Sequence, residues 1–136
     1  MDVSGQRGTL ARLLGYLESD PANAALLRDC AAAAMEAGDV ATADDCYTRL
    51  ERATGLSEAE TSAAGLAAMQ NGRQARAIAL FEALADAHPD DRAIRFNLAW
   101  SLALDRQFER AAALLDEATV AGPPQAAMLD LQLADE

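Results

Sequence analysis

The chain has 136 residues, of which 51 % are apolar but only 4 % aromatic, and a formal net charge of −11. This length allows one domain with one continuous core, built mainly from Ala and Leu. The negative charge argues against nucleic acid and anionic membranes as partners, because both need excess cationic side chains. No apolar run approaches the length of a membrane span, and residues 1–9 lack the apolar stretch of a signal peptide. We therefore expect a cytoplasmic protein.

Apolar residues recur at helical spacing throughout, which predicts an all-α fold. Gly38 suits a helix end that needs positive φ, Asp39 and Asp90 are expected N-caps, and Ser57 with Glu60 has capping-box spacing. The expected helices cover about 9–20, 23–37, 40–53, 58–70, 74–87, 91–104, 107–121 and 125–134.

Small, large and proline residues recur at intervals of 34 residues along these helices. A fixed period of this length is typical of a stack of two-helix units, which cannot bury their apolar faces alone. The recurring residues are alanines (Ala43, Ala77, Ala111), large apolar residues four positions later (Tyr47, Phe81, Leu115) and prolines (Pro21, Pro89, Pro123), with Gly55 at the one repeat position that lacks the proline.

The units 24–57, 58–91 and 92–125 resemble the tetratricopeptide repeat, which carries Leu-Gly-x2-Tyr and Ala-x3-Phe and ends in proline. The middle unit has Gly65, Ala77-x3-Phe81 and Pro89, although the leading aromatic residue of the motif is absent from all three units. The resemblance implies one domain over 1–136, a right-handed superhelix of antiparallel helix pairs. A half-repeat helix at about 9–20 would precede the units, and a capping helix at about 125–134 would follow them.

In this family the first helix of each unit lines a concave groove that binds a partner. Phe96, Trp100 and Leu104 share one face of such a helix, while Leu98 and Leu102 on its other side are needed for packing. A helix that is apolar on two sides must bury the second side. Trp100 is therefore expected either to hold a partner or to pack inside the domain. The implied groove residues are Arg28, Met35, Ser62, Leu66, Met69, Phe96, Asn97, Trp100 and Leu104.

The groove differs from the carboxylate clamp of repeat proteins that hold the acidic tails of chaperones. The resemblance places the clamp positions at Arg28, Ala32, Ala63, Ala93 and Asn97, and only Arg28 and Asn97 fit. We therefore do not expect clamp-type binding.

Few residues are suited to catalysis, so we expect no enzyme, no cofactor and no metal. The chain has no Lys, which excludes a phosphate-loop lysine and a Schiff base. The single His88 lies in a turn, and Asp44 and Asp45 are expected on an exposed helix face. Cys30 and Cys46 are too few for a four-ligand zinc site and are expected to be small buried residues.

The sequence thus favours a non-catalytic protein–protein interaction module, adaptor or chaperone-like, that binds an apolar or amphipathic peptide or helix. A self-associating scaffold, including a homodimer, is the alternative. A chaperone of the type III secretion kind is a third hypothesis, because acidic three-repeat chaperones of that system are similar in size and charge. All 11 basic residues are Arg, which we interpret as the composition bias of a bacterial genome.

Overall fold

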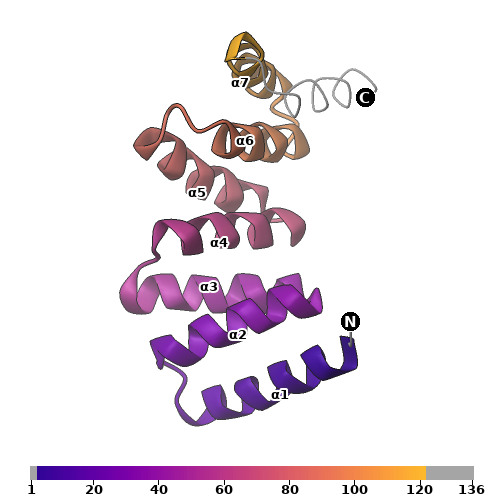
Figure 1. The fold of residues 1–136 in the computed structure, drawn as a ribbon, viewed down its shortest axis with the longest axis vertical. Coiled ribbons are helices and arrows are strands. Elements are labelled where there is room, and N and C mark those ends of the chain that lie inside the picture. Colours follow the sequence, from indigo (N-terminus) through magenta and orange to yellow (C-terminus); the bar gives the residue numbers. More distant parts are fainter. Residues whose placement is uncertain (1–2, 122–136) are drawn as a thin grey trace. The chain divides into compact units, whose positions relative to one another are not determined.

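A computed structural model describes residues 3–121 of the chain, and the side chains of residues 5–115. Over this range the chain forms seven helices and no strand, which confirms the predicted all-α fold (Figure 1). None of the described helices is long and apolar enough to cross a membrane. The helix predicted at 125–134 lies outside the described residues. The helices are α1 (Val3–Ser19), α2 (Ala24–Ala37), α3 (Val40–Thr54), α4 (Glu58–Gln70), α5 (Gln74–Ala87), α6 (Arg92–Leu104) and α7 (Phe108–Ala121).

The helices group into two compact units. The N-terminal unit extends to Asn71, and within it α1 packs on α2, α2 on α3, and α3 on α4. The C-terminal unit begins at Gly72, and within it α6 packs on both α5 and α7. Helices that are neighbours in the chain are therefore neighbours in each unit, as is typical of helical repeats.

The residues that recur every 34 positions form the core of both units. Ala43, Ala77 and Ala111 have no exposed surface, and Phe81 is the largest fully buried side chain among the described residues. Tyr47 and Leu115 are also buried. Alanine at a helix contact lets two backbones approach closely, so the repeat spacing in the sequence predicted where the described helices pack.

Most helix ends follow the predicted signals. Gly38 ends α2 with φ 77°, and its N–H donates to the Met35 carbonyl at 3.2 Å. Asp39 accepts a hydrogen bond from the Thr42 N–H. Ser57 and Glu60 form the predicted capping box at the start of α4, each side chain accepting from the backbone N–H of the other.

Two helix starts differ from the prediction. Helix α1 begins at Val3 rather than at about residue 9. The two glycines in this stretch, each about 1 kcal/mol less favourable than Ala in a helix, had favoured a later start. Helix α6 begins at Arg92, so its N-cap is Asp91 and not Asp90; the Asp91 carboxylate accepts from the N–H groups of Ala93 and Ile94.

Asp44 is buried, contrary to the prediction that it would lie on an exposed helix face. Its side chain is 1 % exposed, and its Oδ2 accepts a hydrogen bond from the Asn71 Nδ2 at 3.0 Å. The physical reason is its position one residue after Ala43 and three before Tyr47, which places it at the edge of the buried stripe of α3. The bond ties α3 to the end of α4, whereas Asp45 is exposed and forms an i,i+4 ion pair with Arg49.

Replacing Asp44 by Ala should lower the free energy of unfolding by about 2 kcal/mol, because a buried hydrogen bond to a carboxylate is lost and Asn71 loses its acceptor. The matched control is Asp45→Ala, which removes an exposed ion pair and should cost less than about 0.5 kcal/mol. Urea unfolding followed by circular dichroism measures both variants. Equal effects of the two substitutions would contradict the structural role assigned to Asp44.

Candidate partner-binding surface

Helix α6 is apolar on two sides, and the described core covers only one of them. Leu98, Ala99 and Leu102 are buried on the covered side. On the other side Phe96 and Trp100 are half-buried, and Leu104 is 46 % exposed. We call Phe96, Trp100 and Leu104 the aromatic face. This apolar surface lies outside the core of the described residues.

The aromatic face is held by a helix with well-bonded ends. The Phe96 and Trp100 rings, four residues apart, stack with their centroids 6.3 Å apart and their planes at 19°. At the start of α6 the Arg95 Nε donates to the Pro89 carbonyl at 2.6 Å, in addition to the Asp91 cap. At its end the Asp105 N–H donates to the Ser101 carbonyl. The rings therefore lie on a rigid element, which limits the entropy lost when they contact a ligand.

A cationic group lies just beyond the aromatic face. Arg106 is exposed, in the turn that connects α6 to α7. Its guanidinium carbon lies 5.5 Å from the centroid of the Phe108 ring, a cation–π arrangement. A ligand that covers Leu104 and continues past the end of α6 would meet this positive charge.

The predicted groove residues divide between the two units. The C-terminal unit contains Phe96, Asn97, Trp100 and Leu104, and among these the structure brings the two rings into contact. A single groove formed by both groups stays a prediction. The N-terminal unit contains the remaining five, of which all but the exposed Arg28 are half-buried: Arg28, Met35, Ser62, Leu66 and Met69.

Arg28 binds a carboxylate of its own unit. Its Nε donates to Glu60 Oε2 at 2.6 Å, and its Nη2 donates to Thr54 Oγ1 at 3.4 Å. The pair connects α2 to the capping box of α4. The Ser57 N–H and, to a smaller extent, Arg28 lower the pKa of the Glu60 carboxyl. Arg28 thus acts here as a link between helices.

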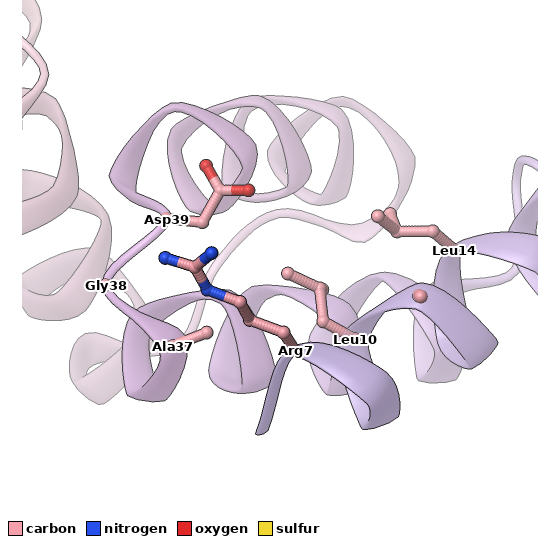
Figure 2. Close-up of a pocket in the computed structure, with 7 residues that line it drawn as sticks. Arg7, Leu10, Leu14, Ala37, Gly38 and Asp39 are labelled. Carbon is pink, nitrogen blue, oxygen red and sulfur yellow. The ribbon is translucent and has the colours of Figure 1, made fainter. Parts of the chain in front are cut away.

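A pocket that the sequence did not predict lies in the N-terminal unit, between α1 and the turn from α2 to α3 (Figure 2). Its volume is about 500 Å³. Figure 2 shows the Arg7 side chain extended toward the Gly38–Asp39 turn, beside Leu10. Arg7 was missed because the helix was predicted to start at about residue 9. With α1 starting at Val3, Arg7 stands one turn before the apolar stripe. The lining residues are Arg7, Leu10, Ala11, Leu14, Ala37, Gly38 and Asp39.

The two cysteines are buried free thiols, as predicted, and they contact each other across α2 and α3. Burial raises the pKa of both thiols, that of Cys46 to about 11. The thiolate, which is the nucleophile and the metal ligand, is therefore disfavoured at neutral pH. No group of three or more metal-binding side chains occurs in the part of the chain that the structure describes.

Both thiols should react slowly with Ellman's reagent at pH 8 in the native protein and rapidly in denaturant. Burial excludes the reagent, and the raised pKa keeps the thiols protonated. The measurement is absorbance against time with and without urea. Rapid reaction of the folded protein would contradict the burial of the pair.

Glu60 should titrate below its ordinary pKa, and Arg28→Ala should raise that pKa only part of the way, because the Ser57 N–H bond remains. A depressed pKa in the folded state means that the carboxylate stabilises the fold above its unfolded pKa. This stabilisation is lost as the pH falls through the folded pKa. NMR titration of the side-chain carboxyl measures the effect, and an ordinary pKa in the wild type would refute it.

The tetratricopeptide repeat family model matches residues 62–126, a stretch that begins in α4 and includes all of α5, α6 and α7. The aromatic face therefore lies within the matched stretch. No curated protein matches the chain.

Proposed function

We propose that this tetratricopeptide-repeat-like protein is an interaction module that binds an apolar or amphipathic segment of another protein on the aromatic face of α6. The observation that carries the proposal is the stacked, half-buried ring pair beside a Leu that is 46 % exposed. Tetratricopeptide repeats typically bind other proteins and are generally non-catalytic, which supports the same class of function.

The chemistry of the face favours an apolar ligand. Trp is enriched among the residues that dominate binding energy at interfaces. From Phe96 to Leu104 the face extends about 12 Å along the helix, at 1.5 Å per residue. Two turns of an amphipathic helix, with apolar residues at i, i+4 and i+8, are about as long. Burial of such a ligand would remove the remaining exposed apolar surface of all three residues from water.

Charge supports a protein partner over a polyanion. At a net charge of −11, the chain repels a nucleic acid or an anionic membrane within the Debye length, which is about 10 Å at 0.1 M salt. We propose an adaptor or chaperone-like role in the cytoplasm.

Self-association is the alternative, and the exposed apolar surface of Leu104 and Tyr16 supports it. Tyr16 on α1 is 59 % exposed. A second copy of the chain could cover either residue. Sedimentation equilibrium over a wide range of concentration decides: a mass that rises toward twice that of the monomer supports the scaffold, and a constant monomer mass removes it.

The proposal is tested by affinity capture from a bacterial lysate, comparing the wild type with a Phe96→Ala/Trp100→Ala variant. The captured partner should bind the variant at least about 100-fold more weakly, since truncating two central aromatic residues costs roughly 3 kcal/mol. Binding of the purified partner, followed by calorimetry, gives the ratio.

The matched control is Tyr16→Ala, which truncates an exposed aromatic residue on α1. It should leave binding unchanged. All three proteins are first checked for equal helicity. Equal capture by the wild type and the Phe96→Ala/Trp100→Ala variant would place the interaction surface elsewhere.

A further inference from the structure

We propose that Arg106 determines the specificity of the aromatic face by pairing with a carboxylate of the partner. The bound segment would carry apolar residues at i, i+4 and i+8 for Phe96, Trp100 and Leu104, followed within one turn by Asp or Glu. This inference rests on the proposed function, because it names the chemistry of the ligand for the same surface.

Arg106 occupies a backbone position that favours glycine. It is the one described residue other than glycine with a positive φ, at 64°. The same position one and two repeats earlier holds Gly72 and Gly38, with φ of 79° and 77°. A left-handed backbone brings a Cβ close to the following carbonyl oxygen, so that a residue other than glycine has a conformational cost there. The third repeat therefore keeps an Arg at a cost that the other two repeats avoid.

The turns at Gly38 and Arg106 form the same backbone hydrogen bonds. The N–H of Gly38 donates to the carbonyl three residues earlier at 3.2 Å, and the N–H of Arg106 does so at 3.0 Å. In each turn the N–H of the next residue donates to the carbonyl five residues before it, at 2.9 and 2.8 Å. The backbone thus gains no hydrogen bond from the Arg, and what distinguishes the third turn is the side chain.

This side chain is exposed close to the end of the aromatic face. Arg106 follows Leu104 by two residues, so their Cα atoms are less than about 8 Å apart. The cation–π contact with Phe108 restricts the guanidinium without neutralising its charge. A guanidinium presents a planar set of N–H donors that matches the two oxygens of a carboxylate. A ligand that covers Leu104 therefore finds a carboxylate site directly beyond it.

The charged neighbours of Arg106 have partners of their own. The Asp105 carboxylate accepts a hydrogen bond from the Gln107 Nε2 at 2.6 Å. Arg110 forms an ion pair with Glu82, at 2.8 Å between Nη2 and Oε2. The contact of Arg106, by contrast, is with a neutral ring. Among the charged residues of this turn, Arg106 is therefore the one suited to bind a carboxylate of the ligand.

The two ends of α6 differ in charge, which fixes the direction of the ligand. At its start the exposed Arg92 is preceded by Asp90 and Asp91, which are exposed as well. An acidic residue of a ligand would meet two carboxylates at that end and the guanidinium of Arg106 at the other. The acidic residue should therefore follow the apolar residues on the side of Leu104. The net charge of −11 opposes further acidic residues elsewhere in the ligand.

The test is phage display of helical peptides that have Leu at i, i+4 and i+8 and are randomised at all other positions. The library is selected separately on the full-length wild type, on Phe96→Ala/Trp100→Ala and on Arg106→Gly. Recovery on the wild type should exceed recovery on Phe96→Ala/Trp100→Ala. Asp and Glu should be enriched within one turn of one end of the Leu set, and this enrichment should disappear on Arg106→Gly.

The Arg106→Gly variant separates recognition from folding. Glycine adopts this φ without cost, so the variant should keep the helicity of the wild type and recover peptides through the Leu set. Arg106→Lys retains the charge and should keep part of the acidic preference. The matched control is Arg92→Gln, which removes an exposed Arg at the other end of α6. It should resemble the wild type.

Calorimetry on one selected peptide gives the size of the effect. Replacing its acidic residue by the amide should weaken binding to the wild type about fivefold at low salt, as expected for an exposed ion pair. The ratio should fall toward one as the salt concentration is raised. On Arg106→Gly the two peptides should bind equally.

The outcomes that overturn the inference are distinct from those that overturn the proposed function. If recovery depends on Phe96 and Trp100 but the wild type shows no acidic preference, or Arg106→Gly retains it, the role of Arg106 is wrong and the docking surface stands. If the wild type recovers no more than Phe96→Ala/Trp100→Ala, the docking surface fails, and this inference fails with it. A dimer of the wild type that recovers no peptide would assign the face to a second copy, which also overturns the inference.

Discussion

The close approach of neighbouring helices through fully buried alanines is the constraint on which the described structure depends. Ala43, Ala77 and Ala111 have no exposed surface, so a larger side chain at any of them would separate the helices that meet there. Alanine contacts bury little area each, and the large residues that follow at i+4, Tyr47, Phe81 and Leu115, are buried as well. The combination of alanine contacts with large buried residues explains how a chain with 4 % aromatic residues forms an ordered core.

The second apolar side of α6 differs from this pattern. In a core built largely from Ala and Leu, Phe96 and Trp100 place much of the aromatic surface of the chain outside the region that packing requires. Their ring stack and the bonds at both ends of α6 hold the face in one geometry. Preorganisation of this kind reduces the entropy cost of binding, which supports the proposed docking of an apolar segment.

The sequence predicted the all-α fold, most helix ends and the alanine positions, because repeat spacing and capping are local or periodic signals. It did not predict the burial of Asp44, since the partner Asn71 lies 27 residues away and no periodic signal connects them. The pocket beside Arg7 was not predicted, because glycines near the N-terminus favoured a later start of α1 than the structure shows. Of the candidate surface, the shared face of Phe96 and Trp100 followed from helical spacing, whereas the Arg28–Glu60 link between helices did not.

The most direct measurement replaces Trp100 by a photo-crosslinking phenylalanine analogue and maps its products by mass spectrometry. Ala113, exposed on α7, serves as the control position. The account predicts that position 100 crosslinks to a partner protein when a bacterial lysate is present, while position 113 does not. Crosslinks from position 100 only to residues of the described core would contradict the account, because the aromatic face would then be part of the interior.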